Sequence, residues 1–188
     1  MNDLFRKEFA IRGRPGEVEI TPRKTHANDL RYKYRRRHGE ENPALRIRIG
    51  TSEIVGVQMK VKGAHEGGII IDGSHQGKQF FANGEKVLEI HVNTVHPTDA
   101  IRLIDLLIEH LPEIKKIGFS GLYGYTPTHA IAQAFIKKTK GNVYEAEEVI
   151  VTEDEKANAK RYYKARIPKH GFPQEHLQNE VIGVAIKF

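Results

Sequence analysis

Hydrophobic and polar residues alternate along much of the first half of the chain, and this period of two predicts β-strands. The alternation is clearest at residues 45–49 and 85–95, and shorter stretches predict strands at residues 17–21, 53–61 and 69–71. Residues 85–95 divide their side chains between two faces, with Leu88, Ile90 and Val92 on one and Glu89, His91 and Asn93 on the other. We therefore predict a series of antiparallel strands up to residue 95.

The second half of the chain shows the helical period instead. Apolar side chains recur three and four positions apart along residues 98–111, where Thr98 is the predicted N-cap and Pro112 the predicted stop. Residues 126–140 repeat the pattern behind Thr126, which precedes a proline at the favoured first helical position. We predict one helix in each segment.

Three more strands are predicted, at residues 116–122, 147–152 and 181–188. A run of strands followed by alternating strands and helices indicates an α+β fold, in which helices flank a mixed, mostly antiparallel sheet. Residues 1–16 contain turn-forming residues and show no period, so we predict an N-terminal arm there. Residues 17–188 then form a single domain.

Composition excludes several classes of protein. The 188 residues are 39% hydrophobic and 29% charged, which is typical of a globular domain, and the lack of cysteine excludes disulfides and cysteine-ligated metals. No apolar run approaches the roughly 20 residues of a transmembrane helix, and no leader peptide opens the chain. We expect a cytoplasmic protein with no membrane partner. No His-x-x-x-His or His-Glu-x-x-His pattern occurs, and we predict no metal site.

The net charge of +6 is placed unevenly. Residues 1–62 carry 15 Lys and Arg against 8 Asp and Glu, whereas residues 63–188 carry 15 against 16. Cations attract phosphate and interleaved tyrosines can stack on bases, so the centre of this excess predicts contact with nucleic acid or another polyanion. A helix is predicted at residues 26–38, and the same side chains can equally be its solvated face. This basic cluster consists of Arg31, Tyr32, Lys33, Tyr34, Arg35, Arg36 and Arg37.

A second basic and aromatic stretch surrounds Tyr162 and Tyr163. It can extend a polyanion-binding surface, or it can be an amphipathic helix that packs its tyrosines inward. We favour the helix.

The order of elements from residue 87 onward resembles that of the GNAT superfamily, the acyl-CoA-dependent N-acyltransferases. The strand at residues 87–92, the helix at 98–111, the strand at 116–122 and the helix at 126–140 carry the resemblance. In that family the turn after the central strand holds the cofactor pyrophosphate through backbone N–H groups, because a helix N-terminus concentrates unpaired donors. The resemblance implies a GNAT-like sheet and an acetyl-CoA site at Asn93, Val95, Thr98 and Asp99.

The same resemblance implies a catalytic group. GNAT-like enzymes often place a carboxylate or a water-relay base on the central strand, which implies Glu89 as the base that deprotonates an amine. His91 shares that strand face and would assist. Polar side chains on one face can equally form the wet side of a sheet.

The cofactor turn departs from the family pattern. Residues 93–99 contain no glycine, Pro97 removes one donor, and Asp99 puts a negative charge where pyrophosphate would sit. The aromatic general acid of the second family motif is also missing around residues 135–138. We therefore predict an atypical GNAT-like protein that binds a polyanion or a protein partner. Its acyl-CoA chemistry would be weak or absent, so that it takes either no cofactor or acetyl-CoA.

Two alternatives stay open. The first is an active acyl-CoA-dependent N-acyltransferase with an unusual cofactor turn. The second is a structural subunit of a larger, virion-type assembly, in which residues 1–16 and 169–178 would dock. A small, basic, cysteine-free chain would suit a bacteriophage or a mobile element.

Overall fold

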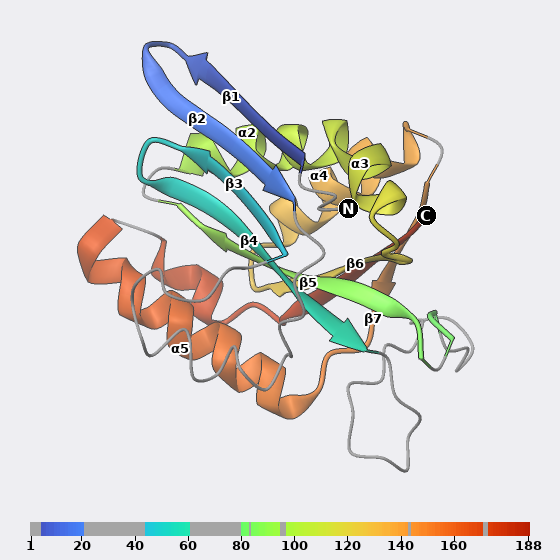
Figure 1. Ribbon diagram of the computed structural model, residues 1–188. Helices are drawn as coiled ribbons and strands as arrows, with labels where there is room; N and C mark the ends of the chain where they lie inside the picture. The colour runs from blue at the N-terminus through green and yellow to red at the C-terminus, as the bar shows by residue number, and fades with distance from the viewer. Residues whose placement is uncertain are drawn as a thin grey trace.

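One mixed sheet forms the centre of the computed structural model, which describes residues 5–20, 44–60, 80–82, 84–94, 97–142, 144–170 and 173–188 (Figure 1). β5 and β6 run parallel, whereas every other described pair of neighbouring strands is antiparallel. The prediction of an α+β fold with a mixed, mostly antiparallel sheet is therefore confirmed. The described strands lie in the order β1 (Phe5–Ile11), β2 (Arg14–Ile20), β3 (Leu45–Ile49), β4 (Ser52–Lys60), β5 (Lys86–Asn93), β6 (Gly121–Thr126), β8 (Ile182–Lys187) and β7 (Glu145–Val149).

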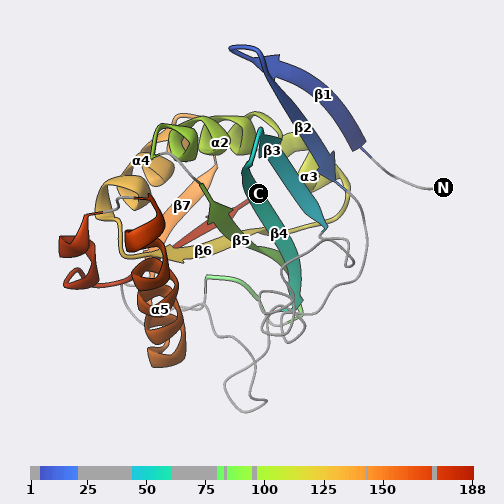
Figure 2. The same ribbon diagram turned by 90° about the vertical axis from the view of Figure 1, so that its left-hand side faces the viewer.

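Helices cover both faces of the sheet (Figures 1 and 2). α2 (Pro97–Glu109), α3 (Leu111–Lys116) and α4 (His129–Lys140) lie on one face. α5 (Glu153–His170) lies on the other face and is followed by the short 3-10 helix η1 (Gln174–Leu177). Within the described residues, no helix is long and apolar enough to cross a membrane.

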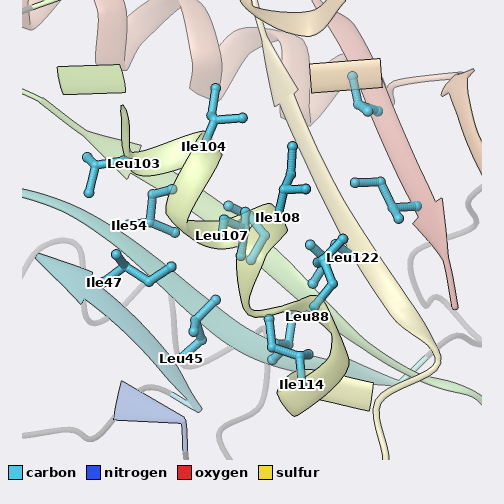
Figure 3. Packing of buried hydrophobic residues seen from close by; sticks show 14 of the residues in the cluster. Leu45, Ile47, Ile54, Leu88, Leu103, Ile104, Leu107, Ile108, Ile114 and Leu122 are labelled. Atoms are coloured by element: carbon cyan, nitrogen blue, oxygen red, sulfur yellow. The ribbon is translucent and has the colours of Figure 1, made fainter. Parts of the chain in front are cut away.

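The main hydrophobic core lies between the sheet and the helices α2, α3 and α4 (Figure 3). α2 contributes side chains spaced at i, i+1, i+4 and i+5, which form one helix face. Full burial of a Leu or Ile side chain stabilises by about 1.5–3 kcal/mol, so this layer fixes the position of α2 behind the end of β5. The packed residues include Leu103, Ile104, Leu107 and Ile108 of α2 and Leu45, Ile47, Ile54, Leu88 and Leu122 of the sheet.

The first described residues belong to the sheet. β1 pairs with β2 along its whole length, and Arg12 and Gly13, with φ of 49° and 76°, form the two-residue turn between them. Positive φ at both positions matches the twist of paired strands. A Cβ at Gly16 would lie 2.1 Å from the ring of Phe9, so the glycine makes room for that ring. Residues 5–11 are therefore a strand where the sequence predicted an irregular arm.

Several predicted boundaries are displaced. α2 begins at Pro97, which puts Thr98 inside its first turn and not at the N-cap. Pro112 lies in the first turn of α3, where a missing N–H breaks no bond, so it helps to begin a second helix. Thr126 ends β6, and its hydroxyl accepts a hydrogen bond from the Thr128 amide at 3.1 Å, so α4 begins later than predicted.

The remaining strand predictions are confirmed in kind. β3, β4, β5 and β8 lie within two residues of their predicted positions, and β7 is shifted toward the N-terminus. The predicted strand at residues 116–122 is displaced to β6 because α3 extends to Lys116. The predictions at residues 26–38 and 69–71 fall outside the described residues.

Candidate functional site

The parallel strands β5 and β6 separate after only three paired positions. Their ladder ends at Glu89↔Tyr123, although β5 continues to pair with β4 as far as Asn93 and β6 with β8 as far as Thr126. The Lys86 carbonyl accepts a hydrogen bond from the Ser120 amide at 2.8 Å, so alternate β5 residues direct their backbone groups toward β6. Beyond the end of the ladder, the backbone groups of Ile90 and Val92 point toward β6 without pairing to it. We call the region between β5 and β6 beyond Glu89 and Tyr123 the divergence.

Glu89 and His91 lie on the α5 face of β5, next to the divergence. The Glu89 residue is only 6% exposed, and its Oε1 atom lies 3.3 Å from Nε2 of His91. The alternation in the sequence predicted that the two side chains share this face, and the structure brings them together. A buried carboxylate beside a partly exposed imidazole can accept a proton and pass it toward solvent.

Tyr123 places a phenol opposite Glu89 at the last position of the ladder. It is almost fully buried. Burial raises the pKa of the Tyr123 hydroxyl well above its ordinary value, and the nearby carboxylates of Glu155 and Glu89 raise it further. The group therefore stays protonated and acts as a hydrogen-bond donor at neutral pH.

Glu155 brings a second buried carboxylate to this place from the first turn of α5. Its Oε2 atom accepts hydrogen bonds from the amide and the hydroxyl of Thr152, at 2.9 and 3.0 Å, in a capping box. Burial raises the pKa of Glu155, and the charge of Glu89 adds to this effect, while the bonds from Thr152 oppose it. Sequence reasoning missed Glu155. The Thr-x-x-Glu spacing at residues 152–155 was the available signal for the helix start, but nothing local indicated its proximity to Glu89.

The four side chains Glu89, His91, Tyr123 and Glu155 are called the acidic cluster below. Among the described residues, neither carboxylate of the cluster forms an ion pair with a lysine or arginine. No described group of three or more His, Asp or Glu side chains has the arrangement of a metal site.

α5 also contacts the end of β5 through Tyr162 and Arg166. Both terminal nitrogens of Arg166 donate to the Oδ1 atom of Asn93, and the guanidinium lies 4.9 Å from the centre of the Tyr162 ring. The Tyr162 hydroxyl lies 3.5 Å from the Val92 carbonyl oxygen. Asn93, which the resemblance assigned to a cofactor, is thus held by α5. Tyr162 and Tyr163 lie on a helix, as the favoured reading of this stretch predicted.

Asp99 is oriented by the sheet and not by the turn before α2. Its buried carboxylate accepts hydrogen bonds from both terminal nitrogens of Arg14, at 3.0 and 2.6 Å, and from the Ser52 hydroxyl at 2.7 Å. Thr98 is exposed in the same helical turn. The negative charge of Asp99, which the sequence analysis expected to repel a pyrophosphate, is therefore paired with the guanidinium of Arg14.

The other predicted site residues do not contribute to this geometry. Val95 and the basic cluster at residues 31–37 fall outside the described residues. An open hollow of about 480 Å³ lies between α2 and α4, lined by residues that include Asp105, Glu109 and Lys138. It is on the opposite face of the sheet from α5, away from the acidic cluster.

No protein-family model, curated protein or solved structure matches the chain.

Proposed function

We propose that the chain is an N-acyltransferase of GNAT-like arrangement, which accepts an acyl-CoA at the divergence and transfers its acyl group to an amine. The observation that carries the proposal is the position of Glu89. A buried carboxylate, paired with an imidazole, stands at the point where two parallel strands separate in front of a helix N-terminus. The order of these elements agrees with the resemblance seen in the sequence.

The residues around the divergence suit an acyl-CoA in three respects. The backbone groups that β5 directs toward β6 beyond the ladder can pair with the amides of an extended ligand, as an added strand would. α2 begins four residues after β5 and presents its positive end beyond the strand. The guanidinium of Arg14 balances Asp99, which removes the repulsion that a phosphate would otherwise meet there.

The bound acyl-CoA would supply an activated thioester carbonyl. Glu89 would take a proton from the ammonium group of the acceptor, because only the free amine is nucleophilic. His91, which is partly exposed, would carry that proton toward solvent. The protonated phenol of Tyr123 would donate a hydrogen bond in the same space.

Calorimetric titration with acetyl-CoA, with free CoA as the comparison, tests the proposal. We expect saturable binding of both and transfer to a primary amine. Glu89→Gln should retain acetyl-CoA binding while kcat falls by about 10²- to 10⁴-fold, the usual contribution of a general base. Glu109→Gln, an exposed change on α2, should leave acetyl-CoA binding and kcat unchanged. No binding of acetyl-CoA at millimolar concentration would refute the proposal.

A second function is proposed from the sequence alone. The basic cluster at residues 31–37 places five cations within seven residues, and we propose that it binds a polyanion such as nucleic acid, or an acidic protein partner. Binding to a single-stranded oligonucleotide should weaken steeply with salt, because neutralised phosphates release counterions. The proposed polyanion binding would be refuted if the affinity did not depend on salt concentration. It would also be refuted if the affinity did not change when Arg35, Arg36 and Arg37 were replaced by alanine.

A further inference from the structure

We propose that two copies of this chain pair through the outer side of β1 and form a two-fold symmetric dimer with one continuous sheet. The inference does not rest on the proposed acyl transfer, because three strands separate β1 from β5 in the sheet and no residue of the divergence takes part. The partner is a second copy of this chain, and the register of the pairing follows from the charges along β1.

The outer side of β1 lies at one edge of the sheet (Figure 2). Among the described strands, only β2 pairs with β1. An edge strand presents a row of N–H and C=O groups that can pair with another chain. The side chains of Arg6, Lys7 and Glu8, in the middle of the strand, are 54%, 51% and 74% exposed. The middle of β1 is therefore accessible to a second strand.

The hairpin geometry decides which backbone groups of β1 point outward. The pair Ile11↔Arg14 closes the two-residue turn, and a turn of this length closes on a hydrogen-bonded pair. Hydrogen-bonded and non-hydrogen-bonded pairs then alternate along the ladder. The Pro15 carbonyl agrees with this alternation, because it accepts a hydrogen bond from the Gly50 amide at 2.8 Å, on the side away from β1. The residues of β1 that direct their backbone groups outward are Arg6, Glu8 and Ala10.

Charge selects one register for the two-fold pairing. Outward-directed residues of one copy must face outward-directed residues of the other, because only these can exchange hydrogen bonds. Pairing Arg6 with Arg6, or Glu8 with Glu8, would oppose like charges across the two strands. Pairing Arg6 with Glu8 of the second copy instead places two opposite-charge pairs symmetrically about the axis. Opposite charges across strands stabilise a sheet and like charges destabilise it, so this register is favoured.

Glu8 faces another carboxylate within its own chain. Its partner across the β1–β2 ladder is Glu17. Glu17 is paired with Arg6 and Arg48, each at 2.6 Å, whereas Glu8 lies 3.4 Å from Arg6. Arg6 of a second copy would lie on the open side of Glu8, where it would extend the alternation of charges along this face of the sheet.

The same register brings aromatic side chains together on the opposite face. Phe5 would face Phe9 of the second copy in a non-hydrogen-bonded pair, the kind in which side chains lie closest. Both are only partly buried by their own chain, where Phe5 packs against the His110 ring with centres 5.5 Å apart. Cross-strand aromatic pairs stabilise a sheet, so these two contacts support the pairing.

One like-charged contact limits the affinity. Lys7 would face Lys7 of the second copy at the two-fold axis. Its ammonium lies 3.5 Å from the Glu109 carboxylate of the same chain, which offsets the repulsion. Lysine on an edge strand also discourages indiscriminate pairing. Because the paired strands are only 7 residues long, we expect a reversible dimer.

The oligomeric state of the full-length chain tests the proposal. In sedimentation velocity from about 10 µM to about 1 mM, the mass should rise from that of one 21.4 kDa chain toward twice that value. Amide hydrogen exchange should slow with concentration at Arg6 and Glu8, and not at Lys7, which already bonds to β2. A single-chain mass throughout, assemblies that grow beyond two copies, or a dimer with unchanged exchange at Arg6 and Glu8 would overturn the proposal.

Charge reversal tests the register. Arg6→Glu and Glu8→Arg each oppose like charges across the axis and should weaken dimerisation about tenfold or more. An equimolar mixture of the two variants should recover it, because every carboxylate then faces an arginine again. The double variant should recover it for the same reason. Failure of the mixture and of the double variant to recover would overturn this register.

Two further comparisons separate a specific contact from general charge effects. Glu153→Arg and Arg161→Glu make the same changes of charge at exposed positions of α5 and should leave dimerisation unchanged. Lys7→Thr removes the like-charged contact and should strengthen dimerisation about threefold or more. Equal weakening by the α5 variants, or weaker dimerisation of Lys7→Thr, would overturn pairing through β1.

Discussion

Arg14 on β2 holds the carboxylate of Asp99 on α2 with both terminal nitrogens of its guanidinium, across 85 positions of sequence. The pair links the hairpin of β1 and β2 to the helix that follows β5. Bidentate pairing fixes orientation as well as distance. The first turn of α2 is thus anchored to β2, the second strand of the sheet, at the place where the proposed ligand would meet the helix.

Arg14→Ala should lower the thermal midpoint, because it leaves the buried Asp99 carboxylate without its guanidinium. Asp99→Ala removes the buried carboxylate and leaves Arg14 unpaired from it, but Arg14 is partly exposed and can be solvated. The double variant should therefore lose less stability than the sum of the two single variants. Differential scanning calorimetry measures all three, and Arg161→Ala, an exposed change on α5, serves as the control. Strict additivity would show that the pair is not energetically coupled.

Glu155→Gln should gain stability relative to the natural chain as the pH rises. The pKa of Glu155 is raised in the folded state, mainly by burial, so the folded state binds its proton more tightly than the unfolded state. Stability is then lost as the pH rises from the ordinary carboxyl value through the raised one. The groups that face Glu155 include Glu89, Tyr123 and Thr152, and His91 lies beside Glu89.

The measurement for Glu155 is the difference in thermal midpoint between variant and natural chain, followed from pH 4 to pH 9. Glutamine cannot ionise, so the difference should grow across that window and then level off. A difference that does not change with pH would contradict the raised pKa.

Two glycines of β6 should respond very differently to alanine. A Cβ at Gly121 would lie 2.0 Å from the Ile186 carbonyl oxygen and 2.6 Å from the Phe81 ring, whereas one at Gly124 would lie 3.2 Å from the Ile90 carbonyl oxygen. Gly121→Ala should cost about 3 kcal/mol or more in the free energy of unfolding, and Gly124→Ala about 1 kcal/mol or less. Urea denaturation measures both. Similar losses at the two positions would reject the steric account.

Lys160→Met should loosen the segment after η1. The ammonium of Lys160 donates to the carbonyl oxygens of His176 and Leu177, at 3.3 and 2.6 Å, and to that of Asn179. Without these bonds, hydrogen exchange at residues 176–181 should accelerate about fivefold or more. Lys164→Met, an exposed change on the same helix, should leave the exchange rates unchanged. Equal rates in the two variants would show that Lys160 does not hold the segment.

Local periodicity predicted the elements whose side chains alternate regularly. Residues 45–49 and β5 were predicted because each strand has one apolar face, and that pattern also placed Glu89 and His91 side by side. The strand β1 was missed because its edge position leaves most of its residues exposed, so few apolar side chains mark it. Its partner β2 contains a proline and a glycine near its start, which read as a turn.

The acidic cluster could be predicted only in part. Glu89 and Tyr123 are neighbours because β5 and β6 are joined by a helix crossover, a local arrangement. Glu155 reaches them only because α5, which connects β7 and β8 in the sequence, crosses the face of the sheet opposite α2. α5 is mostly polar, and its few apolar side chains, such as Ala159 and Tyr163, did not indicate which face of the sheet it covers. Such contacts depend on the whole fold and leave no mark on the local sequence.

The position of β8 between β6 and β7 determines the order in which the strands can join the sheet during synthesis. Among the described strands, β2 to β5 each pair with the preceding one, so β1 to β5 can assemble as they leave the ribosome. β7 cannot join the sheet until β8, the last of these strands to be synthesised, has filled the place beside β6. A nascent chain therefore carries an open strand edge at β6 late in translation, and this is the stage at which aggregation or chaperone capture is most expected.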